Sequence, residues 1–335
     1  MYEAQRPMKR TLLLEHASAV LIERPVATRR LLRSALHNIG LREMRELDQV
    51  PENGAETDLL HAVDLVVVDV SEEDHAGAQL VSNIRRRIAA FNPFIATIAT
   101  SFTATSNVIN VAVNAGTDGI LLKPFSQQQM YDQVLHLIER RRPFVVTANY
   151  IGPERRPRGR PGTSPTPTID VPNTLREKLV RGRAYNHGEA TAAIESAWGR
   201  VNREFSLRGA VQILYLIRLA KAAIEDPTQQ DVGRELARLR DTSKDLLTRI
   251  AEAQLREIAS ELTDWVTHRL DVRLGAGNGV ALDKITHLTA TLACLLGAMQ
   301  TPEELIQQAD RAVLDHRARL AAAAAAAAGA PEVEA

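Results

Sequence analysis

The stretch VVVDVSEEDHAGAQL (residues 66–80) begins with β-forming apolar residues that lead into one acid, Asp69, and then turns polar. An uninterrupted apolar run is typical of a strand that is covered on both faces, as in a parallel sheet. Burial disfavours the charged form of a lone carboxylate at the end of such a strand. Other parts of the chain should therefore place a cation or hydrogen-bond donors beside Asp69.

Four more short β-rich runs and several helix-patterned segments alternate between residues 18 and 142. The runs are AVLIE (19–23), EMREL (43–47), FIATIAT (94–100) and DGILL (118–122). The clearest helical patterns are ATRRLLRSALHNIG (27–40), GAQLVSNIRRRIAAF (77–91) and SQQQMYDQVLHLIERRR (126–142). This alternation predicts an α/β domain: a doubly wound, five-stranded parallel sheet with right-handed crossovers.

Polar side chains occur where the predicted strands end, and in such sheets ligands bind at the carboxyl ends of the strands. Because parallel strands end at one edge, groups that are distant in sequence should converge there. They are Glu23 and Arg24 after the first run, Asp69 in the third, Thr100 and Ser101 at the fourth, and Lys123 after the fifth. A lysine and a hydroxyl beside Asp69 are the compensation that its burial requires.

Residues 18–142 resemble the receiver domain of bacterial two-component response regulators, the chemotaxis-regulator-like fold. The resemblance rests on Asp69, on Gly77 in the position of the family's turn glycine, and on NAGTDGILLKPF (114–125) through the lysine. It implies that Asp69 takes a phosphoryl group from a histidine kinase or phosphotransfer protein with Mg²⁺ bound. It also implies that Lys123 pairs with that group and that a hydroxyl, Ser101 with Thr100 beside it, turns inward to hydrogen-bond it.

The sequence departs from the family pattern at the metal site, where two adjacent acids are replaced by Glu23 and Arg24. Magnesium requires near-octahedral oxygen ligation, so the exchange of a carboxylate for a cation should weaken binding by Glu23 and Asp69. Two unit charges about 4 Å apart interact by roughly 4 kcal/mol at an effective dielectric near 20. Arg24 either repels the metal by an energy of that order or pairs with Asp69 in its place. An active phosphoacceptor and a silent pseudo-receiver both remain open.

The remainder of the chain divides by composition. Residues 143–170 are rich in proline, glycine and arginine, with a basic cluster between Arg155 and Arg160, and are expected to form a linker. Residues 171–320 show only helical patterns, including a seam from Leu236 to Ile250, and are expected to form a helical bundle or coiled coil for output or dimerisation. An alanine-rich tail is expected to be disordered from residue 321.

Composition narrows the function classes. Lysine and arginine total 41, equal to aspartate and glutamate, so no global field indicates nucleic acid or an anionic membrane. The single cysteine excludes an internal disulfide, and no run reaches transmembrane length, so a cytoplasmic protein is expected. The long helices of mixed charge disfavour a DNA-binding output domain. Residues 171–320 contain no group of side chains in a nucleophile or metal-binding pattern, so an enzymatic output domain is not expected. The expected partners are a kinase, a downstream protein and a second copy of the chain.

Overall fold

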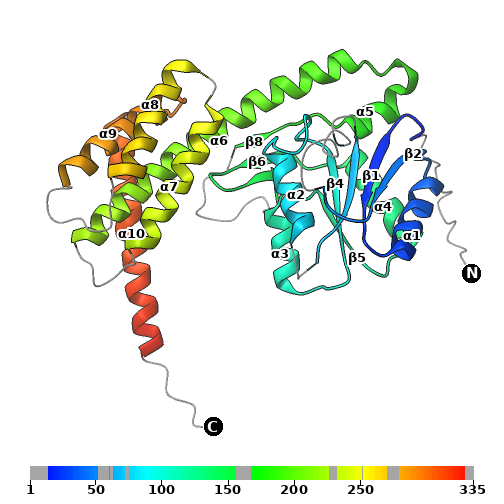
Figure 1. Ribbon diagram of the computed structural model, residues 1–335, viewed down its shortest axis with the longest axis horizontal. Coiled ribbons are helices and arrows are strands. Elements are labelled where there is room, and N and C mark those ends of the chain that lie inside the picture. The colour runs from blue at the N-terminus through cyan, green and yellow to red at the C-terminus, as the bar shows by residue number, and fades with distance from the viewer. Residues whose placement is uncertain are drawn as a thin grey trace, which may run out of the picture. The chain divides into compact units, whose positions relative to one another are not determined.

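The computed structural model describes residues 14–51, 60, 63–71, 75–155, 167–225, 232–250, 252–269 and 279–328. Most of the helices and strands are labelled in Figure 1. They fall into two compact units. The first holds the described residues up to Val146 and from Tyr150 to Val201, and the second holds Thr147–Asn149 and the described residues from Asn202 onward.

The first unit is built on a five-stranded parallel sheet with the order β2-β1-β3-β4-β5. Its strands are β1 (Ser18–Ile22), β2 (Glu43–Leu47), β3 (Leu65–Asp69), β4 (Ala96–Ser101) and β5 (Gly119–Leu122). The helices of this part are α1 (Val26–Asn38), α2 (Ala76–Arg85), α3 (Ser106–Asn114) and α4 (Gln127–Glu139). The predicted doubly wound parallel sheet is confirmed.

Each strand contributes to two apolar layers because its side chains alternate between the faces of the sheet. In β3, Leu65 and Val67 join one buried cluster, which α1 and α4 complete. Val66 and Val68 join the other cluster, which α2 and α3 complete. This is why the run from residue 65 to 68 is apolar without interruption.

The helical pattern of 77–91 extends beyond the helix that forms. α2 ends at Arg85, and Arg87 adopts a left-handed conformation with φ of 59°. The Arg85 side chain is directed into the protein, where it donates to the carbonyls of Pro93, Ile95 and Gly116. These buried hydrogen bonds anchor the end of the helix, which residue periodicity alone does not reveal.

A buried ion cluster fixes the amino edge of the sheet, opposite the edge where the strands end. Asp118, with a side chain that is 1% exposed, receives hydrogen bonds of 2.8 Å from both Arg85 and Arg141. Burial works to raise the pKa of Asp118, but Arg141 and Arg85 together hold it below its ordinary value. The Phe144 ring lies near both guanidinium groups, 5.1 Å from Arg85 and 5.3 Å from Arg141.

The described parts of the predicted linker are ordered, which corrects the expectation of an extended connection at 143–170. Strands β6 (Phe144–Val146), β7 (Ile151–Pro153) and β8 (Thr168–Ile169) form an antiparallel sheet with the order β7-β6-β8. Arg155 donates a hydrogen bond to the carbonyl of Thr117. The buried Phe144 and this contact hold the segment on the first unit. Arg156, Arg158 and Arg160 lie outside the described residues.

The first unit also extends beyond the predicted boundary at residue 171. It includes α5 (Thr174–Arg181), the 3₁₀ turn η2 (Gly182–Ala184) and the beginning of α6 (His187–Glu225). Leu175 is fully buried in the same cluster as α1 and α4. Lys178 donates a 2.8 Å hydrogen bond to the buried Asp64, which precedes β3. Apolar packing and this ion pair place α5 in the first unit.

The second unit is helical, as predicted. It contains the rest of α6, α7 (Val232–Arg249), α8 (Ala253–Asp264), the π-helical turn η3 (Trp265–Arg269), α9 (Gly279–Leu295) and α10 (Pro302–Ala328). The predicted seam residues, from Leu236 to Ile250, are buried in its core. No helix among the described residues is long and apolar enough to cross a membrane.

Helix α10 begins with a capping box formed by Thr301 and Glu304. Thr301 N–H donates to Glu304 Oε2 at 2.9 Å, and Glu304 N–H donates to Thr301 Oγ1 at 3.3 Å. The helix continues to Ala328, so the expectation of disorder is wrong for residues 321–328. Alanine has the highest helix propensity, and the alanine run therefore continues an established helix.

Candidate functional site

The carboxyl edge of the parallel sheet brings together side chains from four strands. Glu23 follows β1, Asp69 is the last residue of β3 and Lys123 follows β5. The parallel register pairs Asp69 with Thr100 of β4, next to Ser101. The convergence that the sequence predicts is therefore present in the structure.

Lys123 lies between the two acids. Its Nζ donates to Glu23 at 2.8 and 3.0 Å and to Asp69 Oδ1 at 2.5 Å. The side chain is only 2% exposed, and its ammonium group lies 4.3 Å from the centre of the Phe102 ring. The backbone N–H of Lys123 also donates to the Ser101 carbonyl at 2.7 Å, which fixes the base of the side chain. One cation thus compensates both carboxylates.

The two acids differ in their access to solvent. Glu23 is fully buried, whereas the Asp69 side chain is 29% exposed. Burial raises the pKa of Glu23, and its contacts with Lys123 oppose that rise. Both Glu23 oxygens accept hydrogen bonds from Lys123. Asp69 is therefore the carboxylate that an incoming reactant can reach.

The two predicted hydroxyls have different surroundings. Thr100 is fully buried, and its Oγ1 donates to Glu23 Oε2 and to the Val68 carbonyl, both at 3.4 Å. Ser101 lines the cleft above Asp69, and its Oγ accepts the N–H of Thr103 at 3.1 Å. Ser101 is thus the hydroxyl that faces the cleft, while Thr100 is buried and hydrogen-bonds to Glu23.

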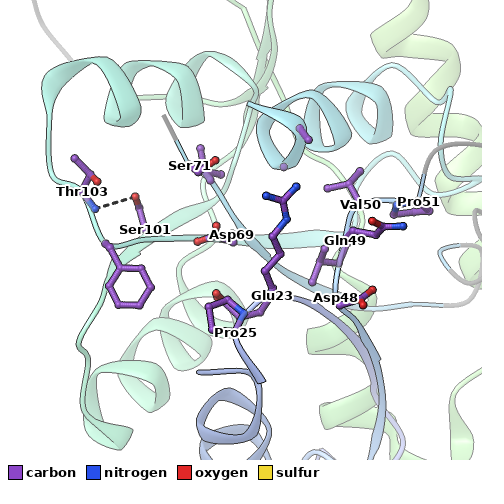
Figure 2. Close-up of a pocket in the computed structure, with 16 residues that line it drawn as sticks. Glu23, Pro25, Asp48, Gln49, Val50, Pro51, Asp69, Ser71, Ser101 and Thr103 are labelled. Carbon is purple, nitrogen blue, oxygen red and sulfur yellow. Dashed lines mark hydrogen bonds between the residues drawn. The ribbon is translucent and has the colours of Figure 1, made fainter. Parts of the chain in front are cut away.

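An open cleft lies over Asp69. Figure 2 shows Asp48, Gln49, Val50 and Pro51 on one side of the cleft and Ser101 and Thr103 on the other. Arg24 is exposed and also lines the cleft. Asp48, which directly follows β2, was not among the residues expected here. The pairing of Ile22 with Leu47 places it beside Glu23 in register, a relation that needs the strand order β2-β1.

Gly77 brings α2 close to the site. A Cβ atom at this position would lie 2.0 Å from the Asp69 carbonyl oxygen and 2.9 Å from Val68 Cγ2. No side chain larger than hydrogen fits without a shift of the backbone. The start of α2 is therefore in direct contact with the end of β3.

One protein family matches the first part of the chain. The response regulator receiver domain family matches residues 20–135. These residues form a response regulator receiver domain. Searched against curated proteins, the whole sequence finds no match.

Three solved structures illustrate the similarity, which at these identities concerns the fold alone. A signal receiver domain from Clostridium thermocellum is 19% identical; the alignment covers 35% of this chain and 94% of that one, with a TM-score of 0.31. A chemotaxis protein from Vibrio cholerae is 17% identical, with coverage of 36% and 97% and a TM-score of 0.32. The Thermotoga maritima response regulator DrrB is 18% identical, with coverage of 38% and 55% and a TM-score of 0.31.

Receiver domains typically bind Mg²⁺ at the phosphorylation site, but the residues around Asp69 do not fit that ion. In the described ranges, no three His, Cys, Asp or Glu side chains are arranged to hold a metal. Both oxygens of Glu23 are bound to Lys123, and Arg24 stands where the family has its second acid. A divalent cation needs several free oxygen ligands, and this receiver domain offers a lysine and an arginine in their place. Glu72, Glu73 and Asp74 lie outside the described residues.

Proposed function

We propose that the chain is a two-component response regulator that accepts a phosphoryl group on Asp69 from a histidine kinase or phosphotransfer protein. The observation that carries this proposal is the asymmetry of the two acids bound by Lys123, of which only Asp69 is accessible from the cleft. The receiver fold of residues 20–135 supports it.

The chain's own residues have the chemistry for this step. An Asp69 carboxylate oxygen forms a bond to phosphorus while the bond from phosphorus to the donor nitrogen breaks, and the leaving imidazole takes a proton. Catalysis of such transfers consists of positioning and of positive charge near the phosphoryl oxygens. Lys123 already lies 2.5 Å from Asp69, and Arg24 lines the same cleft. We expect these two fixed cations to stabilise the transferred group, and the transfer to be slow.

Labelling with a small phosphodonor tests the proposal. The full chain is incubated with acetyl phosphate or phosphoramidate, with magnesium or with EDTA, and its intact mass is followed. Wild type should gain one phosphoryl group in both solutions, and Asp69→Asn should gain none. Asp48→Asn is the matched control, because Asp48 is a second acid that lines the same cleft. Labelling of Asp69→Asn would overturn the assignment of the acceptor.

A second candidate is a silent pseudo-receiver that acts as an interaction scaffold without phosphorylation. It is favoured by Arg24 and by the ion pairs of Lys123, which already neutralise the site without a metal or a phosphoryl group. Absence of labelling in wild type with every donor and in both solutions would support this candidate over the first.

We assign the helical unit the role of output, through binding of a partner protein or a second copy of the chain in the cytoplasm. Its core is apolar and continuous, yet Leu295, Met299 and Leu314 remain 56%, 97% and 65% exposed. Covering these side chains with a partner would remove apolar surface from water, which favours association. Light scattering of the full chain should detect a dimer, and Met299→Ser should weaken it. A strictly monomeric chain at every concentration would remove dimerisation from the proposal.

A further inference from the structure

Arg87 holds the first part of α6 on the receiver domain. Its guanidinium group forms two hydrogen bonds with the carboxylate of Glu195, one of them 2.9 Å long. It also lies 4.6 Å from the centre of the Phe91 ring and 5.8 Å from that of Trp198. The ion pair with Arg87 lowers the pKa of Glu195. A bidentate contact combined with two aromatic rings fixes the guanidinium in both position and orientation. We call Arg87, Glu195 and Trp198 the clasp.

The backbone of Arg87 is part of this arrangement. With φ at 59°, Arg87 is in a left-handed conformation that non-glycine residues seldom adopt. Such a conformation persists where surrounding contacts hold it in place. The turn after α2 is thus shaped so that the Arg87 side chain reaches Glu195.

The clasp acts on a helix that belongs to both units. α6 is continuous from His187 to Glu225, and the division between the units falls after Val201. Within the first unit, one stripe of α6 is buried with helical spacing: Ala190, Ile194, Ala197 and Val201. Glu195 itself is 47% exposed. The clasp therefore lies at the border of a packed helix face, where solvent can enter when the ion pair opens.

The other end of α2 lies at the Asp69 site. Gly77, in the first turn of α2, contacts the Asp69 carbonyl so closely that a methyl group does not fit between them. Arg87 follows the last turn of the same helix. A displacement of the Asp69 backbone must therefore move α2, because tightly packed elements cannot absorb it locally.

We propose that the clasp is a releasable latch. A change of charge in the Asp69 cleft moves α2, α2 opens or closes the latch, and α6 carries the change to the helical unit. The proposal rests on the proposed function in one respect, that the cleft is the input site. A closed latch keeps the first part of α6 packed on the receiver domain. An opened latch exposes the border of its buried stripe and frees that part of the helix. The ion pair suits this role since half-exposed pairs contribute little net stability and open readily.

Hydrogen exchange of the full chain tests the latch. The amides of residues 190–201 are followed in wild type, Arg87→Ala, Glu195→Gln and the exchanged pair Arg87→Glu with Glu195→Arg. Exchange should rise about threefold in each single variant, the size expected for a half-exposed ion pair, and return toward wild type in the exchanged pair. Arg181→Ala is the matched control, because Arg181 also forms an ion pair with α6, at Glu189, without a link to α2. Equal exchange in Arg87→Ala and wild type, or an equal rise in Arg181→Ala, would overturn the latch.

A second experiment tests whether the Asp69 cleft is coupled to α6, and it does not depend on phosphorylation. Asp69→Asn removes the accessible charge of the cleft, leaves Lys123 paired with Glu23, and should raise exchange of residues 190–201 in the wild-type background. It should have little further effect once Arg87→Ala has opened the latch. An equal effect in both backgrounds would show that the cleft reaches α6 by another route and would refute the coupling. If wild type resists labelling but this interaction between variants is present, the latch stands and the phosphoacceptor assignment fails.

Discussion

Replacement of Lys123 by methionine should reveal how strongly the receiver domain depends on one cation. Methionine keeps the length of the side chain but removes the charge that Glu23 and Asp69 share. A unit charge 2.8 Å from a carboxylate is attracted by about 6 kcal/mol at an effective dielectric of 20. Loss of one partner of a buried ion pair has a net cost of about 3–5 kcal/mol, since the other charge remains buried. We expect Lys123→Met to lower the free energy of unfolding of the first unit by that amount.

The destabilisation should depend on Glu23 and on pH. In a Glu23→Gln background no buried charge is left behind, so Lys123→Met should cost only about 1–2 kcal/mol. Burial raises the folded-state pKa of Glu23 above its unfolded value, so the folded state binds the proton more tightly. The stability that this gives is present at acid pH and lost as pH rises through the folded pKa. Without the opposing effect of Lys123 that pKa rises further, so the deficit should grow from pH 5 to pH 8.

The measurement uses the two tryptophans, one in each unit. In a Trp265→Phe background, Trp198 alone reports guanidinium unfolding of the first unit, which avoids the mixed signal of a two-unit chain. An unfolding free energy of Lys123→Met within about 1 kcal/mol of the parent at pH 8 would refute the reasoning. So would a deficit of the same size in the Glu23→Gln background, because the cost would then not arise from the buried acid.

Three further predictions concern other parts of the first unit. Arg24→Asp should increase magnesium affinity at least about tenfold, as followed by titration, since it exchanges a repelling cation for an oxygen ligand; unchanged affinity would show that Arg24 does not affect the metal. Gly77→Ala should destabilise the first unit by about 1–3 kcal/mol in guanidinium unfolding, because its Cβ has no room beside the Asp69 carbonyl; a neutral result would mean that α2 shifts freely. Lys178→Met should cost about 3–5 kcal/mol in the same assay by leaving Asp64 buried without its cation; a smaller cost than that of the exposed pair variant Arg181→Ala would contradict this.

Much of the fold could be predicted because its pattern is local. The apolar run before Asp69 identifies a central strand, and the rule that parallel strands end at one edge brings Lys123 to it. The place of Asp48 in the cleft could not be predicted. Its strand, β2, is only partly buried, and the position of β2 beside β1 is set by the strand order, not by the local sequence. The end of α2 could not be predicted either, since the Arg85 side chain bonds to backbone carbonyls that are distant in sequence.

In the second half of the chain, too, local features could be predicted from the sequence and long-range contacts could not. The seam from Leu236 to Ile250 and the capping box at Thr301 follow from residue spacing, and both are present. The boundary between the units does not follow from composition. Prolines and glycines between 143 and 170 indicate a linker, but the buried Phe144 and the pairing of Lys178 with Asp64 depend on distant partners. Contacts of long sequence separation are the ones that local patterns cannot reveal.

The pairing of Asp64 with Lys178 has a consequence for synthesis on the ribosome. The two residues are 114 positions apart, and Asp64 precedes the central strand β3, whereas Lys178 lies far beyond the last strand of the parallel sheet. A chain that grows at about 5–20 residues per second exposes the completed sheet sequence for several seconds before Lys178 has been added. During that interval Asp64 has no lysine, and the face that receives Leu175 is open to water. The nascent receiver domain should therefore reach its final stability only after α5 has left the ribosome, which a comparison of chains arrested before and after α5 emerges would reveal.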